Sequence, residues 1–298
     1  MNNMPDLPIK SFLSLFAICC LFAPSIYIRA SENVLSETQV SPEKEVLAQH
    51  LLVQSFPENQ QDTELLEILN DTKTFPRIKK LISSNFILNT PVQFHIQHAN
   101  KTKIIAPDEE QKVNVIELSF NFLHTLHQGL LNKYEHQADA INIIFSSSVE
   151  FYIWSEFADY LIREKQLEIR GDSYATKDNF AAIMLLNQNN PNSDYIADAS
   201  EAYLLLRNTN SSTLSQHTQN ELQLDQLRYQ HIICLTLGFD QIIQNPDIER
   251  LHLNSFSWDE AKLEQCKNSY RLIMKNWHLA ISPSLQKTSI IHHWINLL

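Results

Sequence analysis

Two pairs of side chains have both the type and the spacing that metal chemistry needs. His124 and His127 are three residues apart, so in a helix both imidazoles can lie on one face and bind a metal with a third group. Glu156 and Asp159 have the same spacing, and with Asp178 they could bind a hard cation such as Ca²⁺ or Mn²⁺. Both spacings also occur where the side chains are only solvated. The residues alone leave these alternatives open.

Composition excludes several common classes of enzyme. The chain has 298 residues and only three glycines, Gly129, Gly171 and Gly238. These are too far apart to form a G-x-G-x-x-G turn, a P-loop or a G-x-S-x-G elbow, so dinucleotide-binding enzymes, P-loop NTPases and α/β-hydrolases of standard pattern are excluded. Lys and Arg total 23 against 34 Asp and Glu, a net charge of −11, and no basic stripe is present. Nucleic acid is not an expected partner, because phosphate binding requires clustered cations.

Residues 1–30 are typical of an export signal rather than of the folded protein. A polar start containing Lys10 precedes an apolar run over residues 11–28, and Ala30 supplies a small residue for cleavage. We therefore expect a periplasmic or extracellular location. The alternative is an uncleaved anchor, since an apolar run of this length can just span a bilayer. Such an anchor would be the protein's expected contact with a membrane.

The elements that must position the candidate residues are mostly helices. Residues 31–61 are polar and are expected to form a partly ordered leader, and residues 62–298 a single domain. Apolar residues with a period of 3.6 predict helices near 119–132, 137–165, 174–188, 198–207, 221–237 and 257–279. The histidine pair lies on the first of these helices and the carboxylate pair on the second.

Several residues predict where helices begin and end. Asp62 is expected to cap one helix, and Pro76 to start the next. Gly238 is expected to end the helix over 221–237. Ser257 and Glu260 have the spacing of a capping box at the start of the last long helix.

Two short segments predict a small sheet. Val92, Phe94 and Ile96 alternate with polar residues, which is the pattern of a half-buried strand. A second strand is expected over residues 113–118. The fold class that follows is α+β, a predominantly helical body with a small sheet.

The segment from Val149 to Leu186 resembles a bacterial family of inferred zinc metallopeptidases, otherwise a domain of unknown function. The family pattern is approximately F-H-E-L-G-H-A-L-I, followed after a short loop by G-R-E-E-D-A-A-D-Q. In such a pattern two histidines four apart on a helix bind Zn²⁺, and the glutamate between them is the general base. A glutamate from the second helix is the third ligand. The two segments align without a gap, and Gly171 falls at the family's glycine.

At the family's zinc ligands this chain has other residues. Ser155 and Asp159 take the places of the two histidines, and Tyr174 takes the place of the ligand glutamate. Glu156 remains at the general-base position, and Asp178 remains at the position whose carboxylate hydrogen-bonds to a metal ligand. Serine and tyrosine are poor neutral ligands for Zn²⁺. The resemblance therefore implies a site that has lost its zinc, with Glu156 idle and no cofactor bound.

The resemblance extends over about residues 62–286. Further segments within residues 222–277 resemble the family's H-S-L-D-x-Q-R-F, its L-C-L with Y-G-S-D, and its R-A-x-x-C. By themselves, Cys234 and Cys266 could form a disulfide in an oxidising compartment or remain two buried thiols. They fall on two recurrent cysteine positions of the family, and the resemblance thus favours the disulfide.

The resemblance implies a zincin-like fold and an exported pseudoenzyme that acts by binding a protein or peptide. The alternative is an active metal-dependent hydrolase or peptidase whose metal is not zinc, or is relocated to His124 and His127. A relocated metal requires both imidazoles to point into the cleft that holds Glu156. A third hypothesis is a purely structural domain whose cleft is filled by Tyr174 and Trp154.

Overall fold

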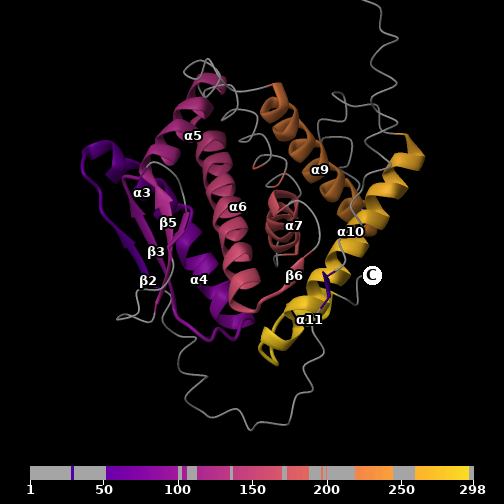
Figure 1. The fold of residues 1–298 in the computed structure, drawn as a ribbon. Helices are drawn as coiled ribbons and strands as arrows, with labels where there is room; N and C mark the ends of the chain where they lie inside the picture. Colours follow the sequence, from indigo (N-terminus) through magenta and orange to yellow (C-terminus); the bar gives the residue numbers. More distant parts are fainter. Residues whose placement is uncertain are drawn as a thin grey trace, which may run out of the picture.

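The architecture of the chain is given by a computed structural model (Figure 1). It describes residues 28–29, 52–99, 103–105, 113–134, 137–169, 173–187, 219–243 and 259–294, with single positions at 196 and 199. Only the backbone is described for residues 28–29, 103–105, 168–169, 173–174, 219–226 and 240–243. Most of the predicted export signal and leader, and most of the predicted helix over 198–207, lie outside the described residues.

A small mixed sheet lies on one side of the molecule (Figure 1). The strands β2 (Leu52–Ser55), β3 (Val92–Gln97) and β5 (Asn114–Ser119) are parallel, and β4 (Lys103–Ile105) pairs antiparallel with β5. Their order in the sheet is β2-β3-β5-β4. Buried and half-buried positions alternate along β3, so one face of the strand meets the core. Both predicted strands are confirmed.

Two short helices, α3 (Gln60–Asp71) and α4 (Thr74–Asn85), follow the first strand of the sheet. Asn59, not Asp62, caps α3: its side chain accepts a hydrogen bond from the Asp62 N–H, and the Asp62 carboxylate accepts one from the Asn59 N–H. This reciprocal capping box places Asp62 inside the first turn, where it is fully buried. Pro76 lies in the first turn of α4, but the helix begins at Thr74, so the predicted start at Pro76 is two residues too late.

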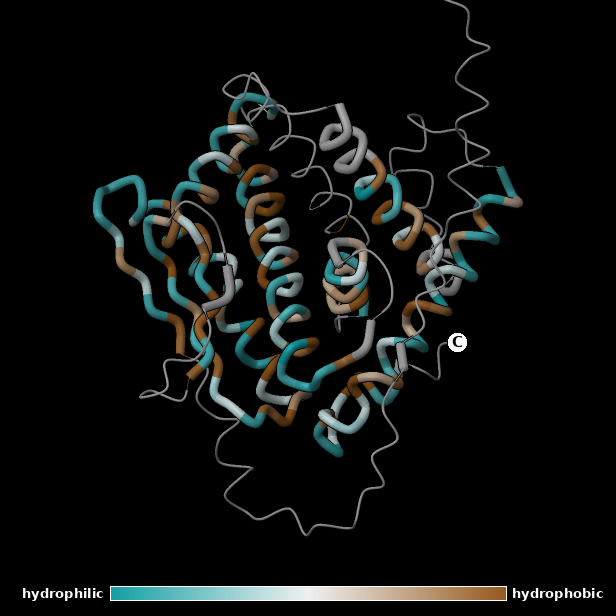
Figure 2. Tube along the Cα trace, in the orientation of Figure 1, coloured by the Kyte–Doolittle hydropathy of each residue, from teal (hydrophilic) through white to brown (hydrophobic). Residues whose placement is uncertain are grey.

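The helix α6 (Ala138–Glu164) runs through the middle of the molecule, between the sheet and the C-terminal helices (Figure 1). It contacts α4, α5 (Phe120–Lys133), α7 (Ser173–Leu186), β4 and β5. Hydrophobic residues recur along its length (Figure 2), and Phe151, Trp154 and Phe157 have no exposed surface. This burial fixes the rotation of α6 and thereby the direction of its polar residues. The predicted helices over 119–132 and 137–165 are confirmed.

Among the described residues after 165 the chain is mainly helical, and β6 (Glu168–Ile169) pairs antiparallel with β1 (Ile28–Arg29). The described helices of this half are α7 (Ser173–Leu186), α9 (Gln219–Ile243), α10 (Glu260–Ile281), the 3₁₀ turn η5 (Ser282–Ser284) and α11 (Ile291–Trp294). The N-cap of α10 is Asp259, whose side chain accepts from the Lys262 N–H, so the predicted capping box of Ser257 and Glu260 is wrong.

Gly238 lies inside α9 and does not end it, because the helix continues to Ile243. The prediction that the helix ends at this glycine is therefore wrong. A Cβ atom at this position would lie 2.4 Å from the backbone oxygen of Cys266 in α10. The absence of a side chain lets the two helices approach closely.

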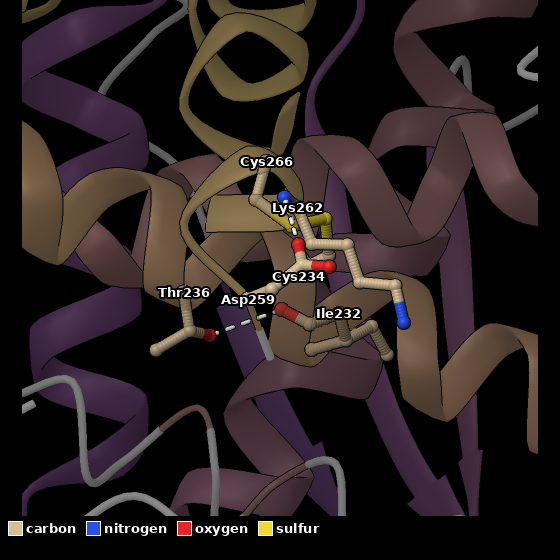
Figure 3. The surroundings of a disulfide bond; sticks show 6 residues. All are labelled: Ile232, Cys234, Thr236, Asp259, Lys262 and Cys266. Atoms are coloured by element: carbon tan, nitrogen blue, oxygen red, sulfur yellow. Dashed lines mark hydrogen bonds between the residues drawn. A yellow bond between two sulfur atoms is a disulfide. The ribbon is translucent and has the colours of Figure 1, made fainter. Parts of the chain in front are cut away.

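Next to this crossing, Cys234 of α9 and Cys266 of α10 form a disulfide that closes a separation of 32 residues (Figure 3). The disulfide that the family resemblance favours is confirmed. On the same interface the rings of Phe239 and Tyr270 pack with their centroids 5.6 Å apart. A covalent bond, a close glycine contact and an aromatic pair thus hold α9 against α10.

The observed fold is predominantly helical with a small sheet, in agreement with the expected α+β class. Among the helices within the described ranges, none combines the length and apolar character needed to cross a bilayer. The zincin-like arrangement stays a prediction.

Candidate functional site

The α6 segment of the motif places three polar side chains within one turn. Ser155 is buried with 5% of its surface exposed, while the side chains of Glu156 and Asp159 are 17% and 34% exposed. Because Glu156 and Asp159 are three residues apart in a helix, they face the same side. The neighbouring helix α7 packs against α6 there.

The side chain that meets these two carboxylates is Lys177 of α7. Its Nζ lies 3.6 Å from Glu156 Oε1 and 3.8 Å from Asp159 Oδ1. Asp159 has a second cation nearby, since Arg163 Nε lies 3.7 Å from its Oδ2. Burial raises the pKa of Glu156 above its ordinary value, and the Lys177 ammonium opposes that rise. The two carboxylates are therefore paired with protein cations.

The residues present do not fit the zinc ion that the resemblance implies. A zinc site needs imidazole, thiolate or carboxylate ligands that converge on one point, whereas Ser155 offers only a hydroxyl and Asp159 is paired with cations. Two unit charges about 4 Å apart repel by about 4 kcal/mol at an effective dielectric constant of about 20, and a divalent ion beside Lys177 would meet roughly twice that repulsion. No step of a metal-dependent reaction can be derived for these residues.

Asp178, the other retained residue, turns away from this group toward α9. Its carboxylate accepts two hydrogen bonds from Arg228, at 2.7 Å from Nε and 2.9 Å from Nη2, and its side chain is 1% exposed. Beside it, Asn179 Oδ1 lies 2.5 Å from His231 Nε2. The structure therefore does not bring Asp178 together with Glu156 and Asp159, and the arrangement does not favour a three-carboxylate site for Ca²⁺ or Mn²⁺.

The structural hypothesis requires Trp154 and Tyr174 to fill a cleft, and the structure describes the side chain of Trp154 only. Trp154 has no exposed surface and packs edge-on against Phe157 and Phe180, with ring centroids 5.7 and 6.2 Å apart. It belongs to the core between α6 and α7, so it does not fill an open cleft. Tyr174 lies on α7, but its side chain is outside the described part of the structure.

The histidine pair lies elsewhere. His124 and His127 line a pocket of about 610 Å³ between α3 and α5, with Glu64 on the opposite wall. Glu156 is not among the lining residues of this pocket and faces Lys177 instead. The condition set by the relocated-metal hypothesis, imidazoles in one cleft with Glu156, is not met. Within the described ranges, no three His, Cys, Asp or Glu side chains converge as metal ligands would.

Sequence reasoning assigned no role to Lys177, the residue that organises this site. A signal was present, because the residue at this position of the family pattern is alanine and here it is a cation one residue from Asp178. What the sequence did not give is its distance from α6, since Lys177 and Glu156 are on different helices. Only the packing of α7 on α6 brings the ammonium to the two carboxylates.

Comparison with known proteins places the chain in a family. No curated protein and no solved structure gives a significant match. A family model does match, over residues 55–281, which is most of the chain. The chain therefore belongs to the family described as "Putative metallopeptidase" (DUF4344).

Proposed function

We propose that the protein is an exported, metallopeptidase-like pseudoenzyme that has lost zinc and acts by binding a protein or peptide. The observation that carries this proposal is the Lys177 ammonium, which lies within 4 Å of Glu156 and Asp159, where the family pattern expects the metal-binding helix. Family membership supports the metallopeptidase-like scaffold. The disulfide supports export, because structural disulfides persist in oxidising compartments.

The ammonium also explains how the scaffold tolerates loss of the metal. Two partly buried carboxylates without a counter-charge would be unfavourable, since burying a charge requires a partner. Lys177 supplies that partner from within the chain, so the α6–α7 contact does not depend on a cation from solution. A water molecule near Glu156 would then have no metal to lower its pKa, which leaves the general base without an activated nucleophile.

The first test is the zinc content of purified, untagged protein by elemental analysis. We expect far less than one zinc per chain. About one zinc per chain that is lost in the Asp159→Ala variant would overturn the proposal, because it would show that the altered residues still bind metal.

A matched pair of variants isolates the role of the ammonium. The changes Ser155→His, Asp159→His and Tyr174→Glu restore the family's ligands, and they can be combined either with Lys177 or with Lys177→Ala. We expect tight zinc binding only in the Lys177→Ala background, because a divalent ion is repelled by the ammonium. Equal zinc binding in both backgrounds would show that Lys177 does not oppose the metal.

The binding role is tested with a displayed random peptide library selected on the wild-type protein. Peptides held at the former substrate site should lose affinity for the Asp159→Arg variant. The control is Leu279→Arg, at an exposed position of α10. Selected peptides that bind both variants as well as wild type would contradict binding at this site, and a library that yields no binders would contradict a peptide partner.

A further inference from the structure

Outside the α6–α7 site, one buried carboxylate joins three elements of the fold. Asp62, in the first turn of α3, has no exposed surface. His98, which follows β3, lies with Nε2 2.8 Å from Asp62 Oδ2, and His124 of α5 lies with Nε2 2.6 Å from Asp62 Oδ1. An ionised carboxylate can only accept hydrogen bonds, so both Nε2 atoms must carry a proton.

Asp62 stays ionised throughout the neutral range. The backbone N–H groups of Glu58 and Asn59 also donate to its Oδ2, at 2.8 and 3.3 Å. Burial by itself would raise the pKa of Asp62, but the hydrogen bonds from His98, His124 and the Glu58 amide outweigh burial and hold this pKa well below its ordinary value. The carboxylate is a fixed negative charge at the junction of α3, α5 and the end of β3.

The second ring nitrogen of His98 also faces an acceptor. Its Nδ1 lies 3.4 Å from Asn121 Oδ1, and the Asn121 amide is oriented by donating from Nδ2 to the Ala99 carbonyl at 3.0 Å. A neutral ring with its proton on Nε2 would turn an unprotonated Nδ1 toward that oxygen. The imidazolium, by contrast, donates to Asp62 on one side and to Asn121 on the other.

We infer that His98 is held as an imidazolium at neutral pH, and that Asp62, His98 and His124 form a pH-sensitive clasp which weakens as the pH rises. The titratable groups around His98 are Asp62 in α3, Glu58 just before α3, and His124 in α5. Beyond His124 lie His127, also on α5, and Glu64 on the facing wall of the pocket. The carboxylates nearest to His98, Asp62 and Glu58, thus place negative charge beside its ring.

Electrostatics agrees with the hydrogen-bond geometry. The hydrogen bond to Asp62 is the largest influence on the pKa of His98 and raises it above its ordinary value. Burial lowers this pKa, whereas Asn121 and Glu58 raise it further. His98 is 27% exposed, so its proton can exchange with solvent. A group whose pKa is raised on folding stabilises the fold below its unfolded pKa, and this contribution is lost as the pH rises through the folded pKa.

The clasp acts on the point where the chain leaves β3 toward β4. The Ala99 carbonyl accepts hydrogen bonds from Asn121 Nδ2 and from the Ser119 hydroxyl, so residues 98 and 99 are bound to the start of α5. β4 is one of the two edge strands of the described sheet and contacts α6, the helix of the candidate site. Loss of the His98 charge should therefore loosen the connection between β3 and β4 first.

The test is an NMR titration of the histidine ring signals in the full-length protein. We expect one ring, identified by its absence in His98→Gln, to titrate above the ordinary value of 6.5. Asn121→Ala removes one acceptor and should lower that titration point while the pairing with Asp62 remains. A His98 ring that titrates at or below 6.5 would overturn the inference.

The second measurement is thermal stability between about pH 6 and pH 9. As the pH rises, the melting temperature of the wild type should fall more than that of His98→Gln. Amide hydrogen exchange at residues 98 and 99, corrected for its intrinsic pH dependence, should become faster in the wild type. If His98→Gln does not fold, the His98 signal is identified as the ring whose titration point falls in Asn121→Ala, and Asn121→Ala takes the place of His98→Gln in the stability measurement. Identical pH profiles for wild type and variant would refute the clasp.

Discussion

The substitution Gly238→Ala tests the close contact between α9 and α10, because the contact and helix propensity predict opposite changes in the free energy of unfolding. A Cβ atom at position 238 would lie 2.4 Å from the oxygen and 2.7 Å from the carbon of the Cys266 carbonyl. Both are backbone atoms inside a helix, so they cannot rotate away as the end of a side chain can. The two helices must separate locally to admit the methyl group.

The magnitude follows from two opposing terms. Replacing glycine by alanine in the interior of a helix stabilises it by about 1 kcal/mol. Forcing a methylene-sized group into a packed interface costs about 1–3 kcal/mol, and a backbone obstacle at this distance argues for the upper end. We expect a net decrease of about 2 kcal/mol in the free energy of unfolding, measured by urea denaturation with helical circular dichroism as the signal.

The neighbouring disulfide provides the control. Replacing Cys234 and Cys266 by alanine removes the covalent bond that holds the helices together, so Gly238→Ala should cost less in that background. The difference between the two costs is the coupling energy of a double-mutant cycle. A Gly238→Ala variant that is more stable than wild type would refute the reasoning, because helix propensity would then outweigh the contact.

Two further predictions concern the buried connections of α9. Arg228→Met removes the guanidinium that gives two hydrogen bonds to the carboxylate of Asp178, which is 1% exposed, and we expect the free energy of unfolding to fall by about 3–5 kcal/mol in urea denaturation. The matched control Lys267→Met breaks a solvent-exposed pair with Glu264 and should cost less than about 1 kcal/mol. Equal losses in the two variants would contradict the prediction. Reduction of the disulfide, which closes 32 residues, should lower the free energy of unfolding by about 3–4 kcal/mol on the loop-entropy estimate, and a denaturation midpoint unchanged by reductant would contradict it.

Local patterns in the sequence predicted most of the secondary structure. The alternation of Val92, Phe94 and Ile96 predicted β3, and a 3.6-residue period predicted α5, α6, α7, α9 and α10. These predictions succeed because periodic burial is a property of the segment itself. The choice of capping residue was less predictable, as Asn59 and Asp259 show, because several nearby polar residues can accept the same backbone hydrogen bonds.

Gly238 shows the limit of local rules. A glycine near the end of an apolar periodic stretch is the usual signal for a helix stop, yet here it permits a contact with a residue 28 positions later, Cys266. Asp62 and His98 show the same limit, because a carboxylate and an imidazole 36 residues apart have no spacing rule that joins them. Their relationship exists only after the residue that follows β3 has been placed beside the first turn of α3.

The candidate site divides in the same way. The sequence by itself determined that the family's ligand positions hold Ser155, Asp159 and Tyr174, since residue identity needs no structure. The tertiary structure decided what surrounds them: α7 brings Lys177 to Glu156 and Asp159, and α9 brings Arg228 to Asp178. The physical reason is that charge pairing depends on distance in space, and distances between helices are set by the packing of their buried faces rather than by separation along the chain.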